Sequence, residues 1–357
     1  MRRDSITHDD SARLVEEVQA AIALKEPLFI RGASSKAFLG RPAAPRSREI
    51  DTRSHRGIVS YDPSELVITA RAGTPLAELN AALDDANQML PCEPPTYGGQ
   101  ATVGGAVAAG LSGPRRPWSG SVRDFVLGCR VVTGEGKHLR FGGQVMKNVA
   151  GFDVSRLISG SFGCLGLLTE VSLKVLPKPR ASASLVIAME ASDAMRELSA
   201  WRRAALPLSG ACFIDVALHV RLEGGTGLVR SAVDRIGGKK LDARFWDDLR
   251  DQRLAFFDDR RPLWRLSLPN ATPLVELPGA VLLDWAGAQR WLKSDASAAD
   301  IRAIASAAGG HATCFTPHGG VEPFHPIPSP LMQLHRQLKA RLDPHGIFNP
   351  GRMYADY

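Results

Sequence analysis

Three short stretches of the chain concentrate glycine and other small residues beside segments whose patterns predict strands or helices. They are IRGASSKAFLG at 30–40, TYGGQATVGGAVAAG at 96–110 and ISGSFGCLGLLTE at 158–170. Glycine inside a helix costs about 1 kcal/mol relative to alanine, so Gly104, Gly105 and Gly110 in one short predicted helix need a reason. Without a Cβ the backbone can approach a ligand closely, and N–H groups after a predicted Thr102 cap suit a phosphate or a carbonyl-rich ring. The pattern predicts a ligand held largely by the main chain.

Neither common nucleotide-binding fingerprint occurs in these stretches. The string GGQATVGG lacks the Lys-Ser/Thr ending of a P-loop, and GSFGCLG spaces its glycines at i, i+3 and i+6 rather than as G-x-G-x-x-G. Any dinucleotide must therefore be held in another way. Each stretch alone is equally compatible with tight helix packing or a turn, and it is the three together that favour a ligand.

The N-terminal half alternates predicted strands and helices around these stretches. An apolar stripe over 9–24 predicts a helix with Asp9 or Asp10 as its cap, and Thr74–Pro75 suits the start of a second helix. The loop GEGK at 134–137 is predicted to be a hairpin turn. Further strands are predicted at 28–31, 57–61, 66–73, 125–133 and 167–176.

A proline-broken basic hinge, PKPR at 177–180, separates a second α+β unit from the first. We predict one domain over residues 1–180, a smaller α/β domain over 181–325, and a C-terminal segment over 326–357 that returns to the first domain. In the second half, strands are predicted at 184–189, 212–218, 219–224, 263–269 and 280–285, and helices near 192–204 and 329–342.

Composition excludes several classes of protein. With 44% apolar and 23% charged residues over 357 positions, the chain can bury a large core. Its five cysteines form no C-x-x-C pair, which argues against a disulfide framework or a thiolate metal site and fits a reducing cytosol. No signal peptide and no apolar run of about 18 residues is found. The net charge of +7 favours an anionic ligand or an acidic partner, but scattered arginines and few aromatic residues argue against nucleic acid.

At a larger scale these motifs resemble a known family. The strings RGASSK, PPTYGGQATVGGAVAAGLSGPRR and GGQVMKNVAGFDVSRLISGSFGCLGLLTEVSLKVLPKP are similar to the FAD-binding domain of the vanillyl-alcohol oxidase / p-cresol methylhydroxylase type. The segment DPHGIFNPGRMY resembles the C-terminus of its FAD-linked 2-hydroxy-acid oxidases, and SSKAFLG with MKNVAGFDVSRL resembles the second flavin subunits of bacterial glycolate oxidases. The resemblance implies an α+β fold, in which a two-subdomain FAD-binding domain is joined to a smaller α/β cap domain.

The resemblance also implies which residues hold FAD. The first loop would wrap the pyrophosphate, the second would run along it toward the isoalloxazine ring, and the third would border the adenosine half. Covalent relatives usually have a histidine in the first loop, where this chain has Lys36, so FAD is expected to bind non-covalently. The implied cofactor-binding residues are Arg31, Gly32, Ala33, Ser34, Ser35, Lys36, Pro95, Thr96, Gly98, Gly99, Gln100, Ala101, Thr102, Gly104, Gly105, Gly160, Ser161, Gly163, Gly166, Leu168 and Asn349.

The chain departs from its catalytic relatives in its acid/base groups. Those that act on D-2-hydroxy acids carry a motif resembling H-x-H-x-G-D-G-N, and this chain has no H-x-H. The remaining candidates for a base are His318 and His325, whose alternative role is structural, and no metal is expected. Arg115 is a candidate for holding an anionic substrate or an acidic partner. Lys147 and Asp153 could contact the cofactor or form a salt bridge.

By resemblance the chain is a subunit of a glycolate oxidase complex that oxidises glycolate, or a similar small 2-hydroxy acid, with FAD. Electrons would pass to an iron–sulfur subunit and quinones, and a sister flavin subunit would carry the complete acid/base motif. The alternatives are a free-standing FAD-dependent 2-hydroxy-acid dehydrogenase and a non-catalytic scaffold with a vestigial flavin site. The expected location is cytoplasmic, or peripheral at the inner face of the membrane through the complex.

Overall fold

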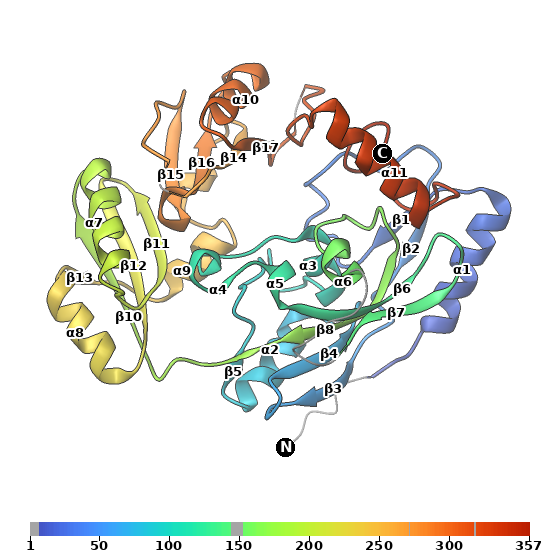
Figure 1. The fold of residues 1–357 in the computed structure, drawn as a ribbon, viewed down its shortest axis with the longest axis horizontal. Helices are drawn as coiled ribbons and strands as arrows, with labels where there is room; N and C mark the ends of the chain where they lie inside the picture. Colours follow the sequence, from blue (N-terminus) through green and yellow to red (C-terminus); the bar gives the residue numbers. More distant parts are fainter. Residues whose placement is uncertain (1–6, 144–152, 271, 318) are drawn as a thin grey trace. The chain divides into compact units, whose positions relative to one another are not determined.

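The computed structural model describes residues 7–143, 153–270, 272–317 and 319–357. These form two compact units (Figure 1). The first comprises the described residues of 1–112, 121–177 and 326–357, and the second those of 113–120 and 178–325. The C-terminal segment thus belongs to the first unit. The short segment 113–120, which the sequence analysis placed in the first domain, belongs to the second.

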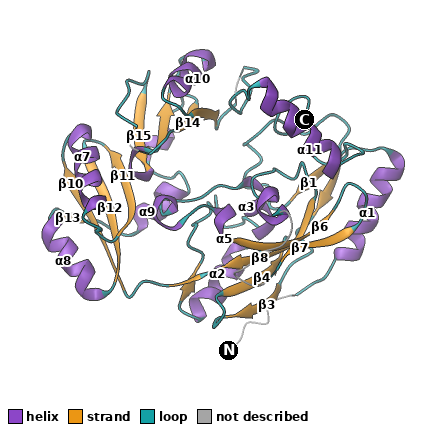
Figure 2. Cartoon of the chain, viewed as in Figure 1, coloured by secondary structure: helices purple, strands orange, loops and turns teal. Residues whose placement is uncertain are grey.

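The first unit is built on an antiparallel sheet with strand order β3-β4-β8-β6-β7 in the described residues, and Figure 2 shows these strands side by side. A parallel pair β1-β2 and a short pair β5-β9 accompany it. The strands are β1 (Leu28–Arg31), β2 (Arg48–Asp51), β3 (Ile58–Asp62), β4 (Val67–Arg71), β5 (Gln88–Met89), β6 (Val126–Val132), β7 (His138–Gly142), β8 (Leu167–Lys174) and β9 (Leu176–Pro177). The helices are α1 (Ser11–Leu24), α2 (Leu76–Asp85), α3 (Val103–Ala109), α5 (Val122–Phe125), α6 (Val154–Ile158) and α11 (Ser329–Leu342).

Both faces of the central strands of this sheet are covered. Leu168 of β8 packs in a core cluster with residues of α2 and α3, whereas its neighbour Leu167 packs in a second cluster with α1 and β1. Because successive side chains of a strand point to opposite faces, a strand covered on both faces buries consecutive side chains instead of every second one. The strand LLTEVSLK accordingly has seven successive buried residues.

Helix starts agree with the sequence analysis at one position and differ at another. Thr102 caps α3, as predicted, by accepting a hydrogen bond from the Gly105 N–H at 3.2 Å. Thr74 does not cap α2, which begins after Pro75 without a side-chain cap. Its hydroxyl accepts the Gly57 N–H at 2.9 Å instead, because it lies buried against a neighbouring loop.

The second unit contains an antiparallel sheet with strand order β13-β10-β12-β11-β15-β16-β14-β17 in the described residues. Its strands are β10 (Ala181–Ala188), β11 (Leu208–Ile214), β12 (Ala217–Gly224), β13 (Lys239–Lys240), β14 (Leu263–Ser267), β15 (Ala280–Asp284), β16 (Gln289–Lys293) and β17 (His311–Cys314). Its α-helices are α4 (Arg116–Ser119), α7 (Ala191–Arg203), α8 (Thr226–Ile236), α9 (Arg244–Arg250) and α10 (Ala298–Ala307), with 3-10 turns at Ala255–Asp258 and Trp285–Gly287.

The chain reversal between β11 and β12 falls earlier than the sequence pattern suggested. We predicted a break between 218 and 219, but Asp215 and Val216 form the turn, both with positive φ. Two left-handed residues are what a tight two-residue hairpin requires. The pattern misled because Val216 is a β-branched residue in a conformation that such residues rarely adopt.

Segment 113–120 is anchored within the second unit by aromatic and ionic contacts. The indole N–H of Trp285 donates to the Gly113 carbonyl at 3.0 Å, and the Arg116 guanidinium lies 4.4 Å from the Trp285 ring centroid. The two terminal guanidinium nitrogens of Arg115 donate to the Glu223 carboxylate on β12. These contacts explain why a segment from the middle of the first domain's sequence belongs to the second unit.

A buried ion pair fixes the C-terminal segment within the first unit. The Lys339 ammonium on α11 donates to the Asp343 carboxylate at 2.6 Å and to the carbonyls of Cys164 and Phe348, each at 2.7 Å. Asp343 in turn accepts the N–H groups of Ile347 and Phe348. One ammonium group thus ties the helix, the third glycine-rich stretch and the chain end together.

No helix of the described residues is both long enough and apolar enough to cross a lipid bilayer. The five cysteines, all within the described ranges, are buried and unpaired.

Replacing Lys339 tests how much the Lys339–Asp343 pair contributes to the free energy of unfolding. Lys339→Ala leaves the fully buried Asp343 carboxylate without a cation, and removing one partner of a buried pair typically costs about 3–5 kcal/mol. We expect chemical unfolding to show a loss of this size. Lys137→Ala, which breaks an exposed pair with Glu135, is the matched control and should change stability by less than about 1 kcal/mol. Similar losses of unfolding free energy in both variants would contradict a stabilising role for the buried pair.

Candidate functional site

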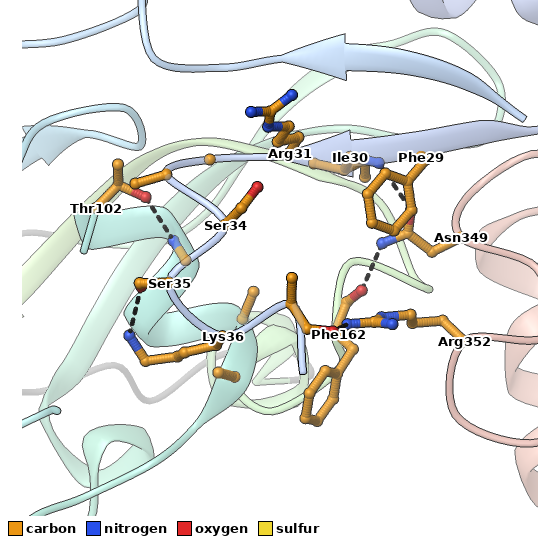
Figure 3. A pocket seen from close by; sticks show the side chains of 16 residues that line it. Phe29, Ile30, Arg31, Ser34, Ser35, Lys36, Thr102, Phe162, Asn349 and Arg352 are labelled. Atoms are coloured by element: carbon orange, nitrogen blue, oxygen red, sulfur yellow. Dashed lines mark hydrogen bonds between the residues drawn. The ribbon is translucent and has the colours of Figure 1, made fainter. Parts of the chain in front are cut away.

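The three glycine-rich stretches converge in the first unit. The first and second meet where Gly32 follows β1: a Cβ on Gly32 would lie only 2.7 Å from the Thr102 hydroxyl oxygen. Figure 3 shows the loop that follows β1 passing beside Thr102 at the start of α3. A side chain at position 32 would therefore displace the Thr102 hydroxyl that caps α3.

The second and third stretches are joined by main-chain hydrogen bonds. The Gly160 N–H donates to the Val107 carbonyl and the Phe162 N–H to the Ala108 carbonyl, both at 2.9 Å. Gly110 ends α3 in the left-handed conformation, and a Cβ there would lie 2.9 Å from the Gly160 Cα. Glycine at 110 therefore satisfies both the helix end and the close approach of two backbones.

Asn349 links the first stretch to the third. Its side-chain oxygen accepts the Ile30 N–H at 2.8 Å, and its amide nitrogen donates to the Phe162 carbonyl at 2.6 Å (Figure 3). Asn349 is buried, and it has a positive φ of 41°. Because it sits in the chain between α11 and the C-terminus, the C-terminal segment completes the site.

Two adjoining cavities lie where these segments meet, and Ile30, Gly32, Gly105, Phe162 and Asn349 line both. The larger one has a volume of about 610 Å³, part of it open to solvent. The predicted cofactor residues that line one or both cavities are Arg31, Gly32, Ala33, Ser34, Ser35, Lys36, Thr102, Gly104, Gly105, Ser161, Gly163, Gly166, Leu168 and Asn349.

The loop after β1 supplies main-chain donors to the larger cavity. In the described part of the chain, the N–H groups of Ala33, Ser34 and Ser35 have no hydrogen-bond partner. Ser34 has a positive φ of 57°, and a left-handed residue within such a loop turns successive N–H groups into an anion-binding concavity. Lys36 adds a cation to the cavity wall. This donor set fits a pyrophosphate.

The glycines at the start of α3 serve two different purposes. A Cβ on Gly104 would lie 2.6 Å from the Ala72 Cβ, so this glycine allows α3 to pack against the end of β4. A Cβ on Gly105 would meet only the Thr102 hydroxyl within 4 Å, at 3.0 Å. Gly105 therefore keeps the cavity open, whereas Gly104 permits close packing of the helix.

Seven predicted cofactor residues lie outside both cavities. Ala101 is fully buried in the core, and its carbonyl accepts the Leu76 N–H at 2.7 Å. Gly98 and Gly99 have positive φ, and a Cβ on either would meet nothing within 4 Å. Glycine is therefore needed there for the left-handed backbone of an open loop and not for space. The seven are Pro95, Thr96, Gly98, Gly99, Gln100, Ala101 and Gly160.

Several cavity residues escaped the sequence analysis. Ala108 and Ala109 lie one turn beyond Gly105 on α3, so helical periodicity could have identified them. Arg352 lies in the NPGR string that carried the C-terminal resemblance, but its role depends on contacts distant in sequence. The residues missed are Phe29, Ile30, Ala37, Thr52, Ala72, Ala108, Ala109, Ile158, Phe162 and Arg352.

Of the two candidate bases, His325 is the one within the described residues, and its ring contacts are structural. His318 lies outside the described residues, as does Lys147. The His325 Nδ1 accepts the Ala312 N–H at 3.3 Å, and its Nε2 lies 3.2 Å from the Ser306 hydroxyl. Burial, together with the charge of Arg302, lowers the pKa of this imidazole. Both ring nitrogens thus have partners within the second unit.

Arg115 and Asp153 also have structural partners. The Arg115 side chain is nine-tenths buried and held by Glu223, an environment that leaves it little freedom to bind a substrate. Asp153 accepts the Arg156 N–H at 3.1 Å, which caps α6, and it also pairs with the Arg156 guanidinium at 3.2 Å.

Comparisons with known proteins agree with this geometry. Residues 6–142 match the model of a family described as FAD binding domain. The chain is 58% identical over 348 residues to glycolate oxidase subunit GlcE of Escherichia coli (strain K12), covering 98% of each chain. It is 34% identical over 137 residues to glycolate oxidase subunit GlcD of Bacillus subtilis (strain 168), which is 38% of this chain and 29% of that protein.

Solved structures show the same fold. A p-cresol methylhydroxylase structure with bound substrate superposes with a TM-score of 0.67 at 14% identity, covering 96% of this chain and 87% of the other. An alkyldihydroxyacetonephosphate synthase gives 0.66 at 17% identity, covering 96% and 74%. The predicted α+β fold of the p-cresol methylhydroxylase type and the prediction of FAD as cofactor are thereby confirmed.

Gly105→Ala tests the proposed purpose of Gly105. The added methyl group would enter the cavity, and such overpacking typically costs about 1–3 kcal/mol, or about 5- to 150-fold in Kd for FAD. Alanine is a better helix former than glycine, so the fold should be retained. The control is Gly227→Ala, at the start of α8 with nothing within 4 Å of a built Cβ. Equal FAD affinity of the Gly105→Ala variant and the wild type, measured by fluorescence quenching, would refute this purpose.

The Arg115–Glu223 pair predicts a pH dependence of stability. Burial raises the pKa of the Glu223 carboxyl, but the Arg115 hydrogen bond and the charges of Arg221 and Arg115 outweigh it, so the net pKa is lowered. A lowered folded-state pKa gives stability that is present above the unfolded value of about 4.3 and is lost as pH falls. We expect the wild type to exceed Glu223→Gln in unfolding free energy by an amount that shrinks below about pH 4.3. A difference that stays constant from pH 7 to pH 3, in urea titrations, would contradict this.

Proposed function

The chain belongs to the family of the glycolate oxidase subunit GlcE, and from this membership we propose that it is the FAD-binding subunit of a complex that oxidises glycolate to glyoxylate. The observation that carries the proposal is the convergence of three glycine-rich segments on one cavity with unbonded main-chain donors. Such a site suits the pyrophosphate of FAD, which carries two negative charges and needs donors more than it needs side-chain bulk.

The residues around the cavity have distinct tasks in this proposal. FAD held in this cavity would supply the redox chemistry, as a carrier of the electrons that come from the hydroxy acid. The N–H groups of Ala33, Ser34 and Ser35 bind the pyrophosphate, and Lys36 offsets its charge. Gly105 leaves space beside α3. Because Lys36 stands where covalent relatives have histidine, attachment is non-covalent.

Proton removal from the substrate hydroxyl is assigned to another subunit. Oxidising a 2-hydroxy acid needs a base near neutral pH, and His325 already uses both ring nitrogens. We therefore assign the base to a sister flavin subunit of the GlcD kind. An iron–sulfur subunit would take the electrons onward to quinones. The assembly would be cytoplasmic, with peripheral contact to the inner face of the membrane through its partners.

Purification under mild conditions tests the proposal directly. We expect the isolated chain to show the visible absorbance band of a flavin, which trichloroacetic acid releases because attachment is non-covalent. With glycolate and a dye acceptor, the isolated chain should be silent, whereas the complex reconstituted with the sister flavin and iron–sulfur subunits should turn over. His325→Ala should leave kcat and KM of the complex within about twofold, since the base is supplied elsewhere.

Two results would overturn parts of this account. Turnover of glycolate or D-lactate by the isolated chain, abolished in His325→Ala, would establish a free-standing dehydrogenase. Absence of a flavin band even after added FAD would establish a scaffold with a vestigial site.

A further inference from the structure

Arg352, beside the larger cavity, makes a set of hydrogen bonds to the loop that follows β1. Its guanidinium donates to the carbonyls of Leu39 at 2.6 Å, Ala37 at 3.1 Å and Arg41. The bond is reciprocated, because the Arg41 N–H donates to the Arg352 carbonyl at 2.9 Å. The residue is 7% exposed and lines the larger cavity (Figure 3). The buried guanidinium thus donates to three main-chain carbonyls of one loop, at alternate positions of the chain.

These carbonyls belong to the segment directly after the main-chain donors. The Ala37 N–H donates to the Ser34 carbonyl at 3.0 Å, and the Leu39 N–H donates to the Lys36 carbonyl at 3.1 Å. Two turns therefore connect the atoms that Arg352 holds with the residues that present N–H groups to the cavity. Fixing Ala37 and Leu39 fixes the conformation of residues 33–36.

The other end of the same loop is held by the same short C-terminal segment. Asn349 accepts the Ile30 N–H where the loop leaves β1, and its carbonyl accepts the Arg352 N–H at 3.1 Å. Asn349 thus fixes the start of the loop and Arg352 fixes its end. The two anchors are only three residues apart in the sequence.

We infer that Arg352 is a positioning residue for FAD binding. Its guanidinium holds the main-chain carbonyls of loop 36–41, and this keeps the main-chain donors of residues 33–35 arranged for a pyrophosphate. The inference rests on the proposed function. Holding a loop in its bound conformation raises affinity by lowering the ordering cost of binding. Only arginine has five N–H donors in a rigid plane, so it can reach several carbonyls at once where lysine, a point charge, cannot.

The shape of the loop fits this role. Gly40 has a φ of +89°, and a Cβ there would lie 3.1 Å from the Arg352 carbonyl oxygen and 3.4 Å from two guanidinium atoms. The loop therefore packs closely on the arginine, which leaves its polar atoms facing main-chain carbonyls. Burial lowers the pKa of the guanidinium, and the three carbonyl oxygens compensate for its lost hydration.

The test measures Kd for FAD in full-length variants, by quenching of flavin fluorescence, beside the melting temperature of the FAD-free chain. We expect Arg352→Ala to raise the Kd at least about tenfold, and Arg352→Lys to give an intermediate value. Millimolar guanidinium chloride should partly restore FAD affinity to Arg352→Ala, whereas equal sodium chloride should not. ADP, which carries the pyrophosphate without the flavin, should lose affinity by the same factor.

Arg336→Ala is the matched control, since Arg336 is an exposed arginine of α11 that pairs with Asp356, outside the loop. Its Kd for FAD should equal that of the wild type. A lowered melting temperature with unchanged Kd in Arg352→Ala, or an equal rise in Kd in Arg336→Ala, would overturn the inference. If Arg352→Ala does not fold, an unchanged Kd in Arg352→Lys decides against it. A wild type that binds no FAD would instead refute the proposed function.

Discussion

The carboxamide of Asn349 joins two main-chain segments that the sequence places far apart, and the cavity depends on that link. Its oxygen holds the strand that leads into the first loop, and its nitrogen holds the third glycine-rich stretch. Asparagine supplies both a donor and an acceptor on one short planar group, so a single buried side chain satisfies both backbones. The Lys339–Asp343 pair then fixes the chain end that carries Asn349.

Close packing between segments explains the abundance of small residues. Gly32 against Thr102, Gly104 against Ala72 and Gly110 against Gly160 each leave no room for a Cβ. These contacts bring the loop after β1, the start of α3 and the loop before β8 to one place. The ligand is then met by N–H groups whose positions are fixed by packing rather than by flexible side chains. Such preorganised donors bind an anion without the ordering cost that long cationic side chains would add.

Sequence reasoning identified part of the cavity lining, because the signals of those residues are local. The Thr102 cap and the glycines after it are recognised from residues close together in the chain. Thr102, Gly104 and Gly105 line the cavities, whereas Gly98, Gly99 and Gly160 lie outside both. Sequence reasoning did not find the partner of a side chain where that partner lies far away in the chain. Arg115 was a candidate for holding an anionic substrate or an acidic partner because it follows the second glycine stretch, yet its guanidinium pairs with Glu223, more than 100 residues away in the chain. Thr74 had the right neighbours for a cap, but burial gave its hydroxyl another partner. Arg352 was invisible for the same reason, since its role consists of carbonyl contacts more than 300 residues away in the chain.

The central claim is that three main-chain segments and the C-terminal link close on one FAD molecule. Hydrogen–deuterium exchange of the full-length chain, with and without saturating FAD, tests it most directly. The account predicts slower amide exchange on FAD addition at residues 33–36, 102–110 and 160–166 together, with added protection around 349–352. Protection confined to one of these segments, or appearing only elsewhere in the chain, would contradict it.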